Sequence, residues 1–548
     1  MTATNPRLED PASGRQQRKR PPRVSGGLPF LGQLLELRRA PLELFWRVHR
    51  ECGEVGEMNW AGQKVVMFYG EEAHEAFFRA PDEQLDQAAA YPFMTPIFGS
   101  GVVFDGTPEQ RKQAMKNTSL RDKMMRSHAE RIAAETERML GSWGESGEID
   151  LLDFFGELTL YTSSACLMGP EFREELTSEY WELFQDLEMG TDAIAYVNPY
   201  LPIPSFRKRD KARRRLVQLI EEIIARRKAK GRQTQDLVYV LTTVKNADGE
   251  PRYTGDQITG MFISMMFAGH HTTSGTAAWS LLELLLHPDV MKSVVEELDD
   301  IYSDGRDVSY QALREIPGLD CAFKETLRLH PPLIILMRKV TGEPFFYKDY
   351  VLEPGVTAAV SPAISNRMPE HFPEPERFDP SRYAPGREED KQGFAWLPFG
   401  AGRHRCVGAA FAMMQLKAIF SVILRRYEFE LSQPPQTYQN DHSKMVVTLK
   451  QPCRVRYRRR QIQQPAATMK ARSTDTDAVA TPAARVTVDL DLCQGHGVCA
   501  TECPEIFGVD EQVMKVKMLR EDVPAELREK ADAAVRYCPT HALKIVED

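Results

Sequence analysis

The sequence predicts two domains, a large and mainly helical one with small β-sheets and a small one at the C-terminal end. With 548 residues, the chain exceeds what a single domain core ordinarily holds. Helix-like patterns fill most of its length, and the longest begins at Thr254 with a capping box and reaches Leu286. Four of the nine cysteines cluster beyond residue 490, behind a stretch without periodicity. That cluster indicates a separate second domain.

Composition and charge exclude several classes of protein. The net charge of −8 argues against a nucleic-acid partner. The cysteines do not form the framework of a secreted disulfide protein, no apolar run is long enough to span a bilayer, and no signal peptide precedes the first domain. We therefore expect a soluble, cytoplasmic protein without a transmembrane segment.

Residues 1–27 form a basic segment, in which six Lys and Arg against two Asp and Glu give a net charge of +4. A disordered tail is the favoured interpretation, and a weak contact with a membrane surface is the alternative.

The large domain is expected to span residues 28–457. Residues 55–69 alternate in polarity around Ala61-Gly62, which predicts a β-hairpin. Residues 91–105 are rich in aromatic residues and hold two prolines and two glycines, which favours a loop. Residues 120–245 have a helical pattern, and a further helix is predicted from Ala409 to Tyr427.

The last of these helices follows a loop with a distinctive cysteine. The loop reads Phe399-x-x-Gly402-x-x-x-Cys406-x-Gly408. A cysteine just before a helix N-terminus is favoured as thiolate, and the glycines allow close approach of a flat cofactor. A buried structural cysteine is the commoner fate of a single Cys, but the pattern is more specific than that.

The long central helix has polar groups in its otherwise apolar middle. It reads Ala268-Gly269-His270-His271-Thr272-Thr273. Polar groups inside a buried helix are costly unless they are used, although Thr hydroxyls often bond back to carbonyls one turn earlier.

These motifs, followed by Glu325-x-x-Arg328 and Pro375-Glu376-Arg377-Phe378 in the expected order, resemble the cytochrome P-450 monooxygenases. The His-Thr pair in the central helix is similar to the sterol 14α-demethylases in particular, over about residues 28–460. The resemblance implies haem b (iron protoporphyrin IX) with Cys406 as the proximal iron ligand. It also implies a mainly α haem-thiolate monooxygenase fold.

The resemblance extends to residues around the haem and the substrate. It implies that Thr272 and His271 deliver protons to iron-bound oxygen, with His271 replacing the Asp or Glu of most relatives through a near-neutral pKa. Ala268 would lie in the groove beside the substrate. Aromatic substrate contacts are implied at Tyr91, Phe93 and Phe98.

Four residues are implied as partners of the haem propionates: Tyr91, Lys112, Arg338 and His404, the last standing where many members have Arg. A buried structural charge network is implied for Glu325, Arg328 and Arg377.

A flexible linker is predicted over residues 458–485, where composition shifts to Arg, Gln, Pro, Ala, Ser and Thr. The second domain then spans residues 486–548. Its thirteen Asp and Glu against seven Lys and Arg give it a charge of −6, which suits docking on a basic surface near Cys406.

The cysteines of the second domain read Cys493-x5-Cys499-x3-Cys503-Pro504, with Cys538-Pro539 further on. In bacterial ferredoxins the run is C-x2-C-x2-C-x3-C-P, and here His496 replaces the second Cys. The domain resembles the small α+β ferredoxins that supply bacterial haem-thiolate enzymes. Cys493, Cys499 and Cys538 would then hold a 3Fe–4S cluster. A 4Fe–4S cluster with His496 or Cys503 as ligand, and a zinc site, are the alternatives.

The function that the resemblance implies is sterol 14α-demethylation, in three O2-dependent oxidations that release the methyl group as formate. An external NAD(P)H-dependent ferredoxin reductase would be the electron source, since the sequence has no Gly-x-Gly-x-x-Gly nucleotide motif. The alternatives are a monooxygenase of another steroid or terpenoid, and a haem-thiolate sensor protein.

Overall fold

The computed structural model describes residues 18–101, 122–175, 178–191, 193–230, 237–246, 248–461, 484–510, 513–538, 540 and 542–547. Lys112 and most of the predicted linker therefore lie outside the described residues.

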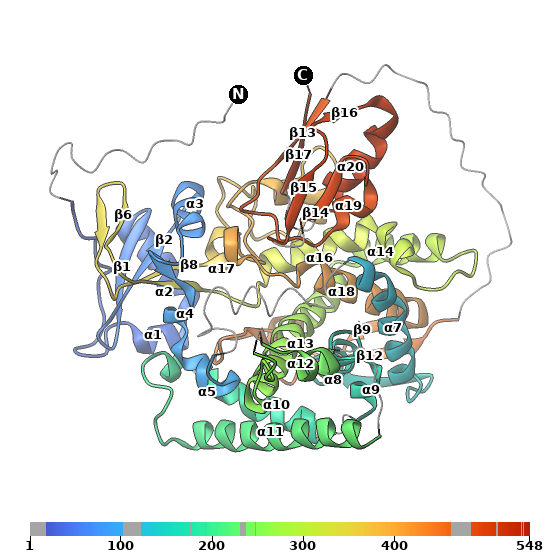
Figure 1. Ribbon diagram of the computed structural model, residues 1–548, viewed down its shortest axis with the longest axis horizontal. Coiled ribbons are helices and arrows are strands. Elements are labelled where there is room, and N and C mark those ends of the chain that lie inside the picture. Colours follow the sequence, from blue (N-terminus) through green and yellow to red (C-terminus); the bar gives the residue numbers. More distant parts are fainter. Residues whose placement is uncertain are drawn as a thin grey trace.

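Helices make up most of the large domain and gather on one side of a small sheet (Figure 1). They are α1 (Leu34–Arg39), α2 (Pro41–Cys52), α3 (Glu71–Arg79), α4 (Gln87–Ala90), α5 (Thr95–Phe98), α7 (Asp122–Leu140), α8 (Leu151–Ser163), α9 (Pro170–Glu175), α10 (Ser178–Glu188), α11 (Pro204–Lys230), α12 (Leu237–Thr243), α13 (Gly255–Leu286), α14 (Pro288–Ile301), α15 (Tyr310–Arg314), α16 (Pro317–Leu329), α17 (Pro362–Ser365) and α18 (Ala409–Arg426).

The main sheet has the strand order β1-β2-β8-β5-β3. The predicted hairpin is confirmed, because Val55 pairs with Phe68 and Trp60 with Gln63. A second sheet has the order β4-β12-β9. The strands are β1 (Val55–Trp60), β2 (Gln63–Phe68), β3 (Leu85–Asp86), β4 (Ser146–Asp150), β5 (Leu336–Val340), β6 (Phe345–Tyr347), β7 (Tyr350–Leu352), β8 (Thr357–Val360), β9 (Tyr427–Leu431), β10 (Asn440–Asp441), β11 (Thr448–Leu449) and β12 (Arg454–Arg459).

Helix α13 forms the axis of the large domain. Its capping box forms as predicted, with Gln257 N donating to Thr254 Oγ1 at 3.2 Å and Thr254 N donating to Gln257 Oε1 at 3.0 Å. At 1.5 Å per residue its 32 residues give a rod of roughly 48 Å. Because it crosses the core, it is apolar on nearly every face.

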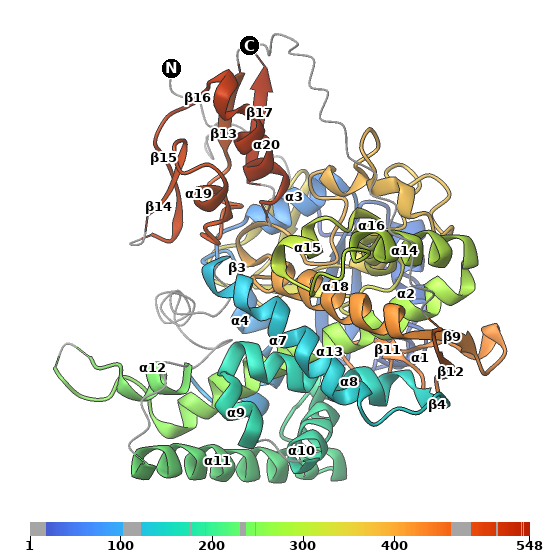
Figure 2. The same cartoon turned by 90° about the vertical axis from the view of Figure 1, so that its right-hand side faces the viewer.

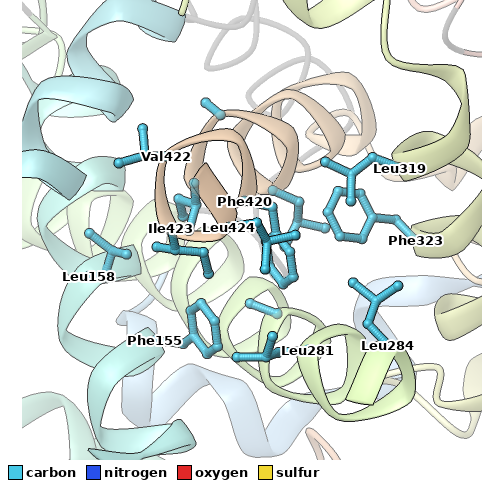
Figure 3. Packing of buried hydrophobic residues seen from close by; sticks show 14 of the residues in the cluster. Phe155, Leu158, Leu281, Leu284, Leu319, Phe323, Phe420, Val422, Ile423 and Leu424 are labelled. Atoms are coloured by element: carbon cyan, nitrogen blue, oxygen red, sulfur yellow. The ribbon is translucent and has the colours of Figure 1, made fainter. Parts of the chain in front are cut away.

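The C-terminal half of α13 packs with α8, α16 and α18 (Figure 3). Phe420 of α18 lies at the centre of this packing. Its ring stacks on Phe155 at 5.9 Å and meets Phe323 edge-on at 4.9 Å, both between ring centroids. Fully burying an aromatic side chain contributes about 1.5–3 kcal/mol, so this core fixes α13 and α18 relative to each other.

Two expectations for the N-terminal part were wrong. Residues 18–27 are not a free tail, since Lys19 N donates to Asp349 O at 2.7 Å and Val24 N to Glu57 O at 2.9 Å. Burial of Val24, which is 3% exposed, holds this segment on β1. The aromatic stretch from Tyr91 is not simply a loop, because it contains two helical turns. Pro92 is the first residue of η1 (Pro92–Met94), and Pro96 is the second residue of α5.

The small domain has its own core around a three-stranded sheet, β16-β13-β17, and a hairpin, β14-β15. Two helices accompany them. The elements are β13 (Ala484–Val488), α19 (Val498–Glu502), β14 (Phe507–Asp510), β15 (Lys515–Met518), β16 (Asp522–Val523), α20 (Arg528–Arg536) and β17 (Leu543–Glu547).

A search for membrane-spanning helices among the described residues finds none with the required length and apolar character.

Candidate functional site

The predicted thiolate loop forms a tight turn that ends at α18. Cys406 N donates to Phe399 O at 2.9 Å, which closes the loop. Gly402 has φ +63°, and a Cβ there would meet the Phe78 carbonyl oxygen at 2.4 Å, so only glycine fits. The loop is therefore fixed between α3 and α18.

Cys406 is accessible in the structure, although the surrounding protein atoms desolvate its thiol. Burial raises the pKa of its thiol, whereas the Gly408 and Ala409 N–H groups and the charge of Arg405 lower it. These donors favour the thiolate that an iron ligand must be.

Two residues in the middle of α13 are accessible as well. Ala268 is exposed and Thr272 half-buried, in a helix whose other central residues are mostly buried. Thr272 Oγ1 donates to Ala268 O at 2.7 Å, so its proton is used within the helix. Its oxygen keeps lone pairs that can accept a hydrogen bond.

Three of the residues predicted to hold propionates come together. Tyr91 Oη accepts a hydrogen bond from Met337 N at 2.9 Å, beside Arg338. Burial raises the pKa of Tyr91 to about 12. His404 Nε2 lies 2.6 Å from Asp82 Oδ1, and the charge of Asp82 acts on Arg338. Sequence reasoning missed Asp82, which stands in no motif.

Arg338 is 2% exposed, and its surroundings suit the binding of an anion. Its Nη1 donates to the carbonyl oxygens of Phe77 at 2.8 Å and Ala80 at 3.2 Å. Within the described residues its Nη2 has no hydrogen-bond partner. Burial lowers the pKa of Arg338 to about 10. A buried cation with an unused donor matches a carboxylate such as a haem propionate.

The predicted substrate aromatics are buried in the main apolar core. Phe93 packs on Tyr196 with ring centroids 4.4 Å apart, and Phe98 meets Phe267 of α13 edge-on at 5.7 Å. Tyr196 was not anticipated, because only tertiary packing brings it to Phe93. Substrate contact by these residues stays a prediction.

His271 joins a charged group that the sequence did not reveal. Its Nδ1 lies 3.6 Å from Glu188 Oε1, and Glu188 Oε2 accepts from Lys444 Nζ at 2.6 Å. Burial lowers the pKa of His271 to about 3, so the expected near-neutral pKa was wrong and the ring is uncharged. In the described part of the molecule its Nε2 has no hydrogen-bond partner.

The predicted charge network is right in two members and wrong in the third. Arg328 makes a bidentate pair with Glu325, with two contacts of 2.8 Å. Arg382, not Arg377, completes the network at 3.2 Å from Glu325. The 3-10 helix η5 (Pro380–Tyr383) turns Arg382 inward, whereas the Arg377 side chain is 64% exposed and pairs with Glu374.

Three cysteines of the small domain lie near one another. The sulfurs of Cys538 and Cys493 act electrostatically on Cys499, and together with burial they raise its pKa to about 12. Cys503 is 0% exposed, and the groups that act on its pKa are Ile506, Glu505 and Lys530, with no cysteine among them.

The loop that carries Cys493 and His496 requires glycine. Gly495 has φ +71°, and a Cβ there would meet the Met514 carbonyl oxygen at 2.4 Å. Among the described residues, no three His, Cys, Asp or Glu side chains stand in a preformed metal-ligand arrangement. The three thiols nevertheless fit an iron–sulfur cluster in type and proximity.

Residues 21–457 match the family described as Cytochrome P450. The chain belongs to the cytochrome P450 family. Residues 486–545 match a second family, the 4Fe-4S single cluster domain. The predicted family resemblance, fold class and haem-thiolate monooxygenase chemistry are thereby confirmed, and so is an iron–sulfur domain fused to a P450 domain.

Curated relatives cover the P450 domain. The sterol 14alpha-demethylase of Mycobacterium tuberculosis is 58% identical over 443 residues, covering 80% of this chain and 98% of that protein. The obtusifoliol 14-alpha demethylase of Sorghum bicolor is 36% identical over 459 residues, covering 82% of this chain and 92% of that protein. A solved structure, retinoic acid bound cyanobacterial CYP120A1, has a TM-score of 0.71 at 20% identity and covers 81% of this chain and 99% of that chain. The last likeness concerns the fold alone.

Proposed function

We propose that this protein is a sterol 14α-demethylase that carries its own iron–sulfur electron donor. The observation that supports this most strongly is the 58% identity to a sterol 14alpha-demethylase over nearly that protein's whole length. The reaction would oxidise the 14α-methyl group to alcohol and aldehyde, and then release it as formate with a new ring double bond. Each of the three steps consumes one O2 and two electrons.

In this proposal Cys406 is the haem ligand, and Tyr91, Arg338 and His404 hold the propionates, together with Lys112. The bound haem would supply O2 activation, for which a thiolate ligand favours O–O cleavage. Tyr91, Phe93, Phe98 and Ala268 would contact the sterol.

The protein's own groups would manage protons on the distal side. Thr272 would accept a hydrogen bond at its hydroxyl oxygen, and His271 would pass a proton as a neutral ring. Glu188, the last residue of α10, would orient His271. The contact of 3.6 Å between them is longer than a hydrogen bond, so a small approach of the two side chains would complete it.

For the small domain we propose a 3Fe–4S cluster held by Cys493, Cys499 and Cys538. The separate environment of Cys503 supports three ligands rather than four. An external NAD(P)H-dependent ferredoxin reductase would reduce the cluster again after each electron transfer. The cytoplasm is proposed as the compartment, because four of the nine cysteines are proposed as metal ligands rather than as disulfide partners.

Product analysis tests the function. The full-length protein is incubated with 14α-methyl sterols, NADPH and a ferredoxin reductase, with Cys406→Ala as the inactive control. The expected products are formate and a demethylated sterol with one additional double bond. A hydroxylated sterol that keeps its methyl group would identify a different steroid monooxygenase. Absence of any sterol-dependent NADPH consumption would instead favour a sensor.

A further inference from the structure

The small domain sits on the surface of the large domain near α3 and α16, in both views (Figures 1 and 2). Three contacts between described residues hold it there. Each uses a residue of the small domain within four positions of a proposed cluster ligand.

The central contact is a hydrogen bond between the two cysteine loops. Gln494 Nε2 donates to the Arg405 carbonyl oxygen at 2.7 Å. Gln494 directly follows Cys493, and the Arg405 carbonyl belongs to the peptide bond that leads into Cys406. One hydrogen bond therefore joins the side chain that follows a proposed cluster ligand to the peptide group that precedes the proposed haem ligand.

The second contact anchors the domains beside this bond. Arg314 Nη1 donates to Glu502 Oε1 at 2.8 Å, and each side chain is only 15% exposed. The Arg314 guanidinium also lies over the Tyr537 ring, 3.6 Å from its centroid. Tyr537 precedes Cys538, so this cation–π contact reaches a second cluster ligand.

The third contact lies at the rim. Arg79, at the end of α3, is 3.3 Å from Asp489 and 3.8 Å from Asp491. These side chains are 34–58% exposed, so salt screens them more than the Arg314–Glu502 pair. We therefore infer that Arg314 fixes the orientation of the small domain, whereas Arg79 only attracts the small domain toward the large one as they approach.

The Arg405 side chain interacts electrostatically with a cysteine of each domain. Burial lowers the pKa of its guanidinium, while Cys406 of the large domain and Cys538 of the small domain act to raise it. Within the described residues its Nε has no hydrogen-bond partner.

Building on the proposed function, we propose that Gln494 and the Arg314–Glu502 pair form the electron-transfer contact of this protein. The pair holds the small domain in place, and the Gln494 hydrogen bond connects the two ligand loops. With both groups bound, one electron would pass from the cluster to the haem across this contact, and the external reductase would restore the electron to the cluster.

The test uses the full-length protein loaded with both cofactors. Variants are Gln494→Leu, Arg314→Glu and the charge exchange Arg314→Glu with Glu502→Arg. Arg306→Glu is the matched control, because Arg306 is 41% exposed and pairs with Asp304 and Glu315 within the large domain. Backbone hydrogen exchange over residues 399–408 and 493–505 reports docking. Stopped-flow reduction of the haem under carbon monoxide reports electron transfer.

Arg314→Glu should reduce exchange protection in both segments by about tenfold or more, as expected for a buried interfacial charge pair, and should slow haem reduction. The charge exchange should restore both. Gln494→Leu should keep the protection and slow haem reduction several-fold. Arg306→Glu should change neither measurement.

Unchanged protection in Arg314→Glu would overturn the docking contact, and unchanged haem reduction in Gln494→Leu would overturn the connecting role of the hydrogen bond. Neither result would affect the proposed function. The proposed function is tested separately, by supplying the same variants with electrons from an excess of a separate ferredoxin and identifying the product.

Discussion

The Glu188 carboxylate lies between the uncharged His271 ring and the positively charged Lys444 amine. It is 6% exposed, and the Lys444 amine balances its charge at 2.6 Å. Lys444 is 35% exposed, so these three side chains form a polar connection from the interior of α13 to the surface. Such a connection offers protons a route to His271.

Replacing this carboxylate should separate proton delivery from substrate binding. In Glu188→Gln we expect unchanged sterol affinity but less product for each NADPH consumed, with the difference appearing as peroxide. Product, NADPH and peroxide are measured in one assay. Glu182→Gln is the control, because Glu182 lies on the same helix and is exposed. Wild-type coupling in Glu188→Gln would remove Glu188 from the proton path.

Cysteine substitutions in the small domain should give two distinct outcomes. Cys499→Ser should lose the cluster, because Cys499 lies with Cys493 and Cys538. Cys503→Ser should keep the cluster, and His496→Cys should admit a fourth iron. Electron paramagnetic resonance of the oxidised protein measures this, since a 3Fe–4S centre is paramagnetic in that state. A silent oxidised wild type with a signal only after reduction would identify a 4Fe–4S cluster instead.

At the scale of elements, the buried network ties α16 to the segment before the thiolate loop. Glu325 accepts from Arg328, from Arg382 and from Tyr383 Oη at 2.9 Å. Arg328 also donates to the carbonyl oxygens of Asn366 and Pro375. Because α16 and this segment flank the loop of Cys406, the network sets the position of the haem ligand indirectly.

Two arginines of this segment provide a matched pair for a stability measurement. Removing the buried Arg382 leaves Glu325 with an incomplete partner set and should cost about 3–5 kcal/mol of the free energy of unfolding. Removing Arg377, an exposed surface pair, should cost about 0–1 kcal/mol. Urea unfolding of Arg382→Leu and Arg377→Leu, followed by haem absorbance, tests this. Equal losses would mean that the network does not stabilise the domain.

The elements that sequence predicted best are those with strong local signals. Residues that are neighbours in sequence determine three of them: the capping box at Thr254, the Ala61-Gly62 turn and the helix after Cys406. Arg382 was missed because its place depends on how η5 turns the chain. Glu188, Asp82 and Tyr196 were missed for the same reason, since each reaches the site from an element far away in sequence.

Acid should destabilise the whole large domain through buried histidines. His74 is 1% exposed, between the Phe394 carbonyl at 3.0 Å and Ser365 Oγ at 3.1 Å. Burial lowers its pKa from 6.5 to about 4. The unfolded chain therefore binds a proton at higher pH than the folded one. The stability that this contributes is complete above pH 6.5 and is lost as pH falls toward 4.

One such histidine makes the free energy of unfolding fall by about 1.4 kcal/mol per pH unit within that window. His74→Gln should therefore flatten the pH dependence by that slope, whatever its effect on stability at pH 7.5. Urea unfolding of both proteins at several pH values between 4.5 and 7.5 measures the two slopes. Parallel slopes would show that His74 does not bind the proton responsible.

On the largest scale, covalent fusion should make electron supply independent of protein concentration. A covalent tether gives the small domain an effective concentration of the order of mM, whereas separate electron-transfer partners form small, weak interfaces. A protease site inserted between residues 461 and 484 allows the tether to be cut. The uncut form of the same variant is the control.

After cutting, the turnover of each molecule should fall on dilution, and added salt should slow it further, because the contacts include ion pairs such as Arg79–Asp489. The uncut form should keep its turnover over the same dilution. Haem absorbance should be identical in both, since the cut lies outside the P450 domain. Should the cut protein turn over equally fast when dilute, the electrons do not pass through the small domain. The ion pairs between the domains would then dock the small domain on the large one without a role in electron transfer.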